Sequence, residues 1–329
     1  MVGSLYQRGV KLKKQKAVIL LNMGGPNNLD EVEVFLKNMF ADKNILTMRS
    51  NLLRKFVGSM IVFSRVEAAQ EIYRKLGGKS PIVGHTKKLV QKLQQQLGDE
   101  VYVDFVMRYT PPFSSEVITK LNNMDIKQIY LIPLYPQYST TTTKSSLEEF
   151  EQSYFALGGD ALLYETKHFF ENKKYNKAVV DTIVNSLGDE KADEFELVFS
   201  AHGLPQKIVD NGDVYQKHLL HHVEILKQML EQNGINFSKI DLAYQSKVGP
   251  MKWLEPSLED KLKEIKSKKV MIYPISFCID NSETDFELGV EYGEIADELG
   301  FEEYRVCRSL NDSPLFVEAL EDIYKKLAS

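Results

Sequence analysis

The sequence predicts an α/β protein in which apolar strands alternate with helices and pair into parallel sheets. Amphipathic helical stretches separate six short apolar segments, and this alternation is typical of βαβ units. A buried strand followed by a small-residue turn and a proline occurs twice, in KAVILLNMGGP and in EFELVFSAHGLP. We therefore expect two similar lobes, with ligand sites just beyond the carboxyl ends of the strands. The expected strands cover residues 17–22, 102–107, 129–134, 197–200, 240–244 and 270–275.

The length and composition fit two ordinary globular domains. The chain has 329 residues, of which 43% are hydrophobic and 26% charged. A formal net charge of −5 argues against a nucleic-acid partner, because phosphate binding normally requires a basic face. Two cysteines, Cys278 and Cys307, cannot build a disulfide framework, so we expect a reducing, cytoplasmic location.

The first lobe is expected to cover residues 1–157. Its start, MVGSLYQRGVKLKKQK, lacks the apolar stretch of a signal peptide, and we expect no membrane-spanning segment in the chain. The segment NLLRKFVGSMIVFSRV, residues 51–66, is apolar and basic with little acidic character. It fits either a core helix or an amphipathic lip, about residues 44–66, that contacts a membrane or an apolar ligand. The segment alone does not decide between the two.

The second lobe is expected to cover residues 158–313, because a Gly-Gly-Asp turn follows the helix that contains residues 147–154. The last helix, within residues 314–329, could pack on either lobe. The stretch YSTTTTKSS at 138–146 follows a strand and precedes a helix. Its hydroxyls and amides could hold an anion, and helix capping explains them equally well.

One histidine is placed where open α/β sheets put reactive side chains. His202 follows a predicted strand directly, within SAHGLP. A lone histidine at a strand end is more often a turn or core residue, but an imidazole can also titrate near neutrality or bind a metal. The H-x-x-H-H pattern of His218, His221 and His222 has a spacing compatible with metal, although a solvated helix face is the favoured interpretation.

An acidic helix follows the strand at 270–275. Glu283, Glu287 and Glu291 are four residues apart and so form a line about 12 Å long on one helix face. A solvated acidic face explains this line by itself. The functional alternative is a carboxylate track for a divalent cation, with Glu283 facing the same crevice as His202.

Seven stretches in the right order make the chain resemble the ferrochelatases, which insert Fe²⁺ into a porphyrin at the end of haem synthesis. No single stretch is specific, but the combination is. The stretches are LNMGGP (21–26), residues 73–82 ending in GGKSPI, MRY (107–109), YPQYS (135–139), SAH (200–202), YQSKVGP (244–250) with WL (253–254), and residues 280–291.

The resemblance implies two Rossmann-like lobes, each a four-stranded parallel sheet flanked by helices, with the porphyrin in the cleft between them. It implies that the catalytic pair His202 and Glu283 faces each other from opposite lobes across the macrocycle. Glu287 and Glu291 would continue the metal-binding line outward, on a helix with a widened π-type turn. The implied porphyrin contacts are Met23, Arg108, Tyr109, Trp253 and Phe277.

The resemblance also implies the reaction, which is insertion of Fe²⁺ into protoporphyrin IX to form protohaem, with release of two protons. It leaves open which of His202 and Glu283 takes the protons and which binds iron. The apolar lip favours protoporphyrin IX, which has an apolar vinyl edge, over coproporphyrin, which has four propionates. The alternatives are a coproporphyrin ferrochelatase, a cobalt or nickel chelatase, and a tetrapyrrole carrier without catalysis.

The chain departs from many relatives at three positions of the acidic helix. Asn281 stands where many have a histidine, so a second imidazole in a proton relay is missing, and Asp285 and Gly289 also differ. Because Cys307 is the only cysteine near the C-terminus, we expect no [2Fe-2S] cluster and no permanently bound cofactor. We expect a monomer or weak dimer, with peripheral membrane contact through the lip.

Overall fold

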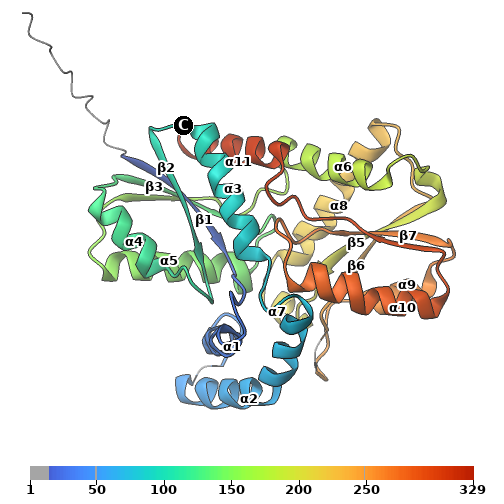
Figure 1. The fold of residues 1–329 in the computed structure, drawn as a ribbon, viewed down its shortest axis with the longest axis horizontal. Coiled ribbons are helices and arrows are strands. Elements are labelled where there is room, and N and C mark those ends of the chain that lie inside the picture. Colours follow the sequence, from blue (N-terminus) through green and yellow to red (C-terminus); the bar gives the residue numbers. More distant parts are fainter. Residues whose placement is uncertain (1–14, 49, 248) are drawn as a thin grey trace, which may run out of the picture.

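The structure, a computed structural model, contains two four-stranded parallel sheets, one in each of two lobes that lie side by side (Figure 1). It describes residues 15–48, 50–247 and 249–329. Residues 1–14, where we expected no signal peptide, lie outside the described residues, as do one position of the expected lip, 49, and one of the YQSKVGP stretch, 248. The prediction of a two-lobed α/β fold is confirmed.

The first lobe runs from β1 to β4. Its elements are β1 (Lys16–Asn22), α1 (Glu31–Ala41), α2 (Asn51–Lys75), α3 (Ile82–Leu97), β2 (Val101–Met107), α4 (Ser114–Asn123), β3 (Gln128–Pro133), the π-helix η1 (Thr140–Lys144), α5 (Ser145–Ala156) and β4 (Leu162–Glu165). The strand order is β2-β1-β3-β4. Every residue of β1 after Lys16 is buried, as expected for a central strand between two helical layers. Helices α4 and α5 form one layer, and α3 lies on the other face.

The second lobe repeats this plan. Its elements are α6 (Lys173–Leu187), the 3₁₀ turn η2 (Ala192–Glu194), β5 (Phe195–His202), α7 (Gln206–Asp210), α8 (Tyr215–Gln232), β6 (Lys239–Gln245), α9 (Leu258–Glu264), β7 (Lys269–Pro274), the π-helix η3 (Glu283–Glu291), α10 (Tyr292–Leu299) and β8 (Glu303–Val306). The order β6-β5-β7-β8 corresponds strand for strand to that of the first sheet. Helices α6 and α8 cover one face, and α9, η3 and α10 cover the other (Figure 1).

The predicted lobe boundary at residues 157/158 is too early. β4 pairs in parallel with β3, so the first sheet continues to Glu165. The six strands expected from the sequence are all present, and β4 and β8 are the two that the apolar pattern did not predict. Both are four-residue edge strands without a buried position, and they are shorter than the six strands that were predicted.

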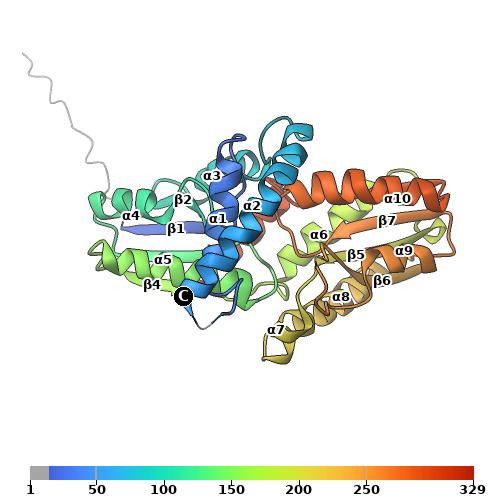
Figure 2. The same cartoon turned by 90° about the horizontal axis from the view of Figure 1, so that it is seen from below.

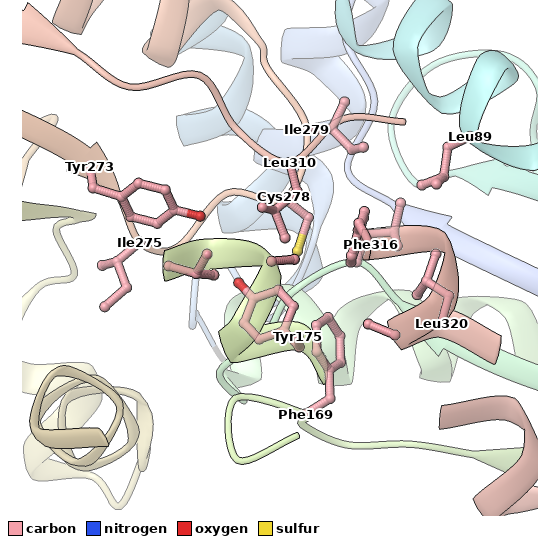
Figure 3. Packing of buried hydrophobic residues seen from close by; sticks show 14 of the residues in the cluster. Leu89, Phe169, Tyr175, Tyr273, Ile275, Cys278, Ile279, Leu310, Phe316 and Leu320 are labelled. Atoms are coloured by element: carbon pink, nitrogen blue, oxygen red, sulfur yellow. The ribbon is translucent and has the colours of Figure 1, made fainter. Parts of the chain in front are cut away.

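The last helix, α11 (Pro314–Leu327), packs against both lobes. It contacts α6 of the second lobe and α3 and β3 of the first. Figure 3 shows Leu89 of α3, Phe316 and Leu320 of α11, and Tyr175 of α6 in one apolar cluster that also contains Cys278. The two lobes therefore share a continuous core.

Helix α2 differs from a core helix over its first half. Leu52, Phe56 and Phe63 are 82%, 65% and 87% exposed, so the core interpretation of residues 51–66 is wrong. The helix is held by its other side, where Gly58 lies against α1 and an added Cβ would come within 3.1 Å of the Phe40 carbonyl oxygen. Figure 1 shows α1 and α2 below the two sheets, and in the view from below they lie in front of the region where the lobes meet (Figure 2). Within the described parts of the chain, no helix combines the length and apolar character needed to cross a bilayer.

Candidate active site

A large cleft lies between the lobes, with a cavity volume of about 1570 Å³. Its walls contain residues that follow the carboxyl ends of strands in both sheets, as expected for this fold. This volume exceeds the roughly 300–1,000 Å³ of common small-molecule pockets, so the cleft suits a large ligand. Among the predicted porphyrin contacts, it is lined by Met23, Tyr109, Trp253 and Phe277.

His202 and Glu283 contact each other in the wall of this cleft. The Nδ1 atom of His202 lies 2.7 Å from Oε2 of Glu283. Both residues come from the second lobe: His202 ends β5 and Glu283 begins η3, which follows the neighbouring strand β7. Both thus lie in the second lobe, within the expected bounds 158–313, and the expectation that they face each other from opposite lobes across the macrocycle is wrong. Adjacent parallel strands bring their carboxyl ends within a few ångströms, which is why the two side chains meet.

Hydrogen bonds fix both members of the pair. The backbone N–H of His202 donates to Ser276 Oγ at 3.0 Å, and the Tyr215 hydroxyl donates to the His202 carbonyl oxygen at 3.1 Å. The backbone N–H of Glu283 donates to Asn281 Oδ1 at 2.8 Å. With Nδ1–H donating to the carboxylate of Glu283, Nε2 of His202 keeps its lone pair and can accept a proton.

The pKa of His202 reflects two opposing effects. Burial in the cleft disfavours the imidazolium and lowers the pKa, whereas the charge and hydrogen bond of Glu283, and then the charge of Glu287, raise it. The net effect is a raised pKa. A raised pKa means that the imidazole of His202 binds a proton more readily than a free histidine does. Its side chain is 38% exposed, so it can be reached from the cleft.

Glu287 and Glu291 continue along η3 from Glu283, and all three line the cleft. The predicted π-type turn is confirmed, and it runs the whole length of the acidic line. Burial, followed by the charge of Glu283, raises the pKa of Glu287 to about 7, although hydrogen bonds from Ser246 and Gln245 oppose this shift. Burial and then Glu294 also raise the pKa of Glu291.

Ser246 links the two inner carboxylates. Its hydroxyl donates to Glu287 Oε2 at 2.6 Å and lies 3.3 Å from Glu283 Oε2, and its backbone N–H donates to Glu287 Oε1 at 2.7 Å. A left-handed backbone with φ of 65° aims both donors at the same carboxylate. Among the residues that the structure describes, no three His, Cys, Asp or Glu side chains are grouped so that they could hold a metal ion.

Arg108 is the predicted porphyrin contact that does not line the cleft. Its Nη2 lies 3.1 Å from Asp42 Oδ2, and its Nε donates to Ser145 Oγ at 3.0 Å. It borders a smaller cavity of about 260 Å³ together with Asp42 and Glu149. Tyr109, the next residue, lines the main cleft and donates its hydroxyl to Asp42 at 2.8 Å.

The family model for ferrochelatase matches residues 15–328, nearly the whole chain. The chain belongs to the ferrochelatase family. It is 63% identical over 314 residues to the ferrochelatase of Sulfurimonas denitrificans, which covers 95% of this chain and 99% of that relative. Identity to the ferrochelatase of Nitratiruptor is 53% (95% and 100% covered), and to that of Helicobacter pylori strain HPAG1 it is 45% (100% and 98% covered). The chain is accordingly a metal chelatase of haem biosynthesis that inserts iron into a porphyrin.

Solved structures of chelatases share the fold of this ferrochelatase-family chain. SirB from Bacillus subtilis with Fe³⁺ superposes with a TM-score of 0.59 at 10% identity, covering 96% of each chain. A sirohydrochlorin chelatase SirB in complex with cobalt, from B. subtilis subspecies spizizenii, gives 0.56 at 11% identity, covering 95% of this chain and 96% of that one. At these identities the likeness concerns the fold alone.

Several cleft residues of this ferrochelatase-family member were not predicted as site residues. Two are basic, Arg65 of α2 and Lys247. The others include Tyr73, whose hydroxyl lies 3.3 Å from Ser282 Oγ across the cleft, and Ser246. Tyr73, Ser246 and Lys247 lie within stretches that carried the family resemblance, so for these three the missing signal was in those stretches. The departure at Asn281 is explained by its hydrogen bonds, because this side chain accepts from the Glu283 N–H and donates to the Ile279 carbonyl oxygen.

The hydroxyl-rich stretch 138–146 binds a carboxylate of the protein itself. Asp213, from the second lobe, accepts from the Thr140 N–H at 2.7 Å, the Thr140 hydroxyl at 2.6 Å and the Ser139 hydroxyl at 3.0 Å. This contact caps η1 and joins the two lobes behind the cleft.

The favoured solvated face for the H-x-x-H-H pattern is wrong for His222. That residue is fully buried, with Nδ1 2.8 Å from Gln137 Nε2 and Nε2 2.9 Å from Asn176 Oδ1. Burial lowers its pKa to about 3. His218 instead accepts from the Tyr138 N–H at 3.2 Å.

Proposed function

We propose that this ferrochelatase-family enzyme inserts Fe²⁺ into protoporphyrin IX to form protohaem, with His202 as the base that accepts the pyrrole protons. The observation that carries the proposal is the His202–Glu283 hydrogen bond in the wall of a cleft large enough for a tetrapyrrole. The enzyme requires no resident cofactor in this proposal, because iron is its substrate.

The arrangement of the pair supports the assignment of roles. A free-base porphyrin has two central N–H protons, which must leave before four nitrogens can bind iron. His202 keeps a lone pair on Nε2 while Nδ1 is held by Glu283, so the imidazole can take one proton at a time as a general base. The imidazolium that forms is stabilised by the adjacent carboxylate.

The acidic line supports the other half of the reaction. Glu291, Glu287 and Glu283 line the cleft in sequence along η3 and end at His202. Carboxylate oxygens bind Fe²⁺ without the strength of thiolates, so the ion can move from one to the next. We assign Glu287 and Glu291 to iron entry, and Glu283 to both the last iron contact and the support of His202.

The charges of the cleft favour protoporphyrin IX over coproporphyrin. Besides His202, the described lining residues with basic side chains are Arg65 and Lys247. These two cations match the two propionates of protoporphyrin IX, whereas the four of coproporphyrin would bring two more anions to a cleft that already contains an acidic line. Apolar side chains such as Met39 and Ile61 of the wall suit vinyl and methyl groups.

The exposed part of α2 supports peripheral membrane contact by an otherwise cytoplasmic enzyme. Its apolar face, defined here as Leu52, Phe56, Met60 and Phe63, lies beside the basic residues Arg54 and Lys55. Apolar side chains flanked by cations are typical of helices that bind at an anionic lipid surface. A monomer or weak dimer leaves this face free for the lipid.

The proposal is tested by metallation of protoporphyrin IX under anaerobic conditions. We expect the wild-type chain to produce the optical change of haem formation, and His202→Ala and Glu283→Gln to lose turnover while remaining folded. His221→Ala is the matched control, since that imidazole is exposed on α8 away from the cleft. If the wild type binds porphyrin without metallating it, the chain acts as a carrier; if coproporphyrin gives the higher kcat/KM, the substrate assignment fails.

A further inference from the structure

A buried carboxylate lies behind the first-lobe wall of the cleft. Asp42 follows α1, and its side chain is 2% exposed. Its Oδ2 accepts hydrogen bonds from Arg108, from the Tyr109 hydroxyl and from the Ser145 hydroxyl. Its Oδ1 accepts from the backbone N–H of Asn44 at 2.8 Å. One carboxylate therefore fixes three side chains that come from two other segments of the lobe.

Arg108 lies one layer of side chains away from the cleft. Its guanidinium carbon is 5.0 Å from the centroid of the Tyr109 ring, and Tyr109 lines the cleft. Its Nε donates to Ser145, and the next residue, Ser146, also lines the cleft. The backbone N–H of Arg108 donates to the carbonyl oxygen of Asn22, another lining residue. A permanent positive charge thus lies directly behind the wall, on a side chain that is 19% exposed.

This charge matters because the enzyme admits a divalent cation. In a partly desolvated cleft, an unbalanced guanidinium directly behind the wall opposes the entry of a dication. The carboxylate of Asp42, 3.1 Å from Arg108, balances that charge. When one member of a buried ion pair is removed, the charge of the other member is no longer balanced.

We propose that Asp42 is a positioning residue for iron: it holds Arg108 behind the wall and balances its charge, so that the cleft stays favourable for Fe²⁺. The role rests on the proposed function, since it concerns the entry of the metal substrate. In this proposal Arg108 does not contact the porphyrin. The balance of charge concerns the metal substrate, whereas the hydrogen bond between Asp42 and Tyr109 concerns the wall that the porphyrin contacts.

Steady-state metallation by the full chain tests the proposal, with Fe²⁺ varied at saturating protoporphyrin and protoporphyrin varied at saturating Fe²⁺. In Asp42→Asn the KM for Fe²⁺ should rise about tenfold because the Arg108 charge is no longer balanced. The KM for protoporphyrin should change less than the KM for Fe²⁺, because asparagine keeps an oxygen that can accept from the Tyr109 hydroxyl. Arg108→Gln should not raise the KM for Fe²⁺, because it leaves a negative charge behind the wall. The double variant Asp42→Asn/Arg108→Gln should return the KM for Fe²⁺ close to the wild-type value.

A purely structural role of Asp42 would give a different pattern. In that case the double variant would be at least as impaired as Asp42→Asn, and this result would overturn the proposal. If Asp42→Asn does not fold, Arg108→Gln alone decides: a raised KM for Fe²⁺, or weakened fluorescence-monitored protoporphyrin binding, refutes the proposal. A wild-type chain that fails to metallate protoporphyrin at all would instead refute the proposed function.

Discussion

Replacing Glu287 with glutamine should stabilise the protein more and more as the pH rises. The ionised carboxylate of Glu287 is unfavourable in the fold, since burial and the neighbouring Glu283 raise its pKa to about 7 from an ordinary 4.5. A carboxyl group with a raised pKa contributes stability below about pH 4.5, and this contribution is lost as the pH rises through about 7. The amide in Glu287→Gln carries no charge. Its oxygen can accept from the Ser246 N–H, which donates to Oε1 of Glu287, and its NH2 group can donate to the Ser246 hydroxyl, which can also act as an acceptor.

The size of this effect follows from the pKa difference. A difference of about 2.5 units corresponds to about 3 kcal/mol at pH 8, at roughly 1.4 kcal/mol per unit, and to under about 1 kcal/mol at pH 5. Between these two pH values, the free energy of unfolding of Glu287→Gln should therefore rise by about 2 kcal/mol relative to the wild type.

Chemical denaturation at pH 5, 6, 7 and 8 measures this difference. Glu318→Gln, at an exposed position of α11, is the matched control for the change of glutamate to glutamine itself. A free-energy difference for Glu287→Gln that is constant over this range, or that shrinks as the pH rises, would show that the buried carboxylate does not titrate as described.

Two further predictions concern the lobe junction and the lip. Asp213→Asn should lower the free energy of unfolding by about 2–3 kcal/mol, because the carboxylate accepts three hydrogen bonds from Ser139 and Thr140, whereas the exposed Asp189→Asn should have little effect in the same denaturation assay. The double variant Phe56→Ser/Phe63→Ser should lose co-sedimentation with anionic vesicles. Its control, Phe155→Ser/Leu157→Ser, changes exposed apolar residues away from the lip and should bind as the wild type does; equal losses in both double variants would contradict a membrane role for α2.

The inner strands of both sheets could be predicted from the sequence because they are buried on two faces. Strand β1, for example, is apolar from Ala17 to Leu21, and this run can be read from the sequence alone. The edge strands β4 and β8 lack such a pattern, since their positions are half-buried or exposed. The lobe boundary was misplaced for the same reason.

The position of His202 at a strand end, and of the acidic helix after the next strand, predicted a shared crevice. The direct contact between His202 and Glu283 depends on β5 and β7 being neighbours in one sheet, which the chain order does not reveal. The ion pair of Arg108 with Asp42 could not be predicted either, because the two residues lie far apart in the sequence. The π-helix under the acidic line followed only from the family resemblance, since residues four apart suit an ordinary helix as well.

The position of α11 restricts how the enzyme can admit a planar ligand of tetrapyrrole size. This helix and the core around Phe316 connect both halves of the chain on the side that α3 and α6 share. A hinge rotation of one lobe against the other would expose the buried side chains of this shared core to water, which costs free energy. Helix α2 lines the cleft through Ile61 and Arg65 and exposes much of its surface, so we expect substrate entry and product exit to depend on this helix more than on the relative position of the lobes.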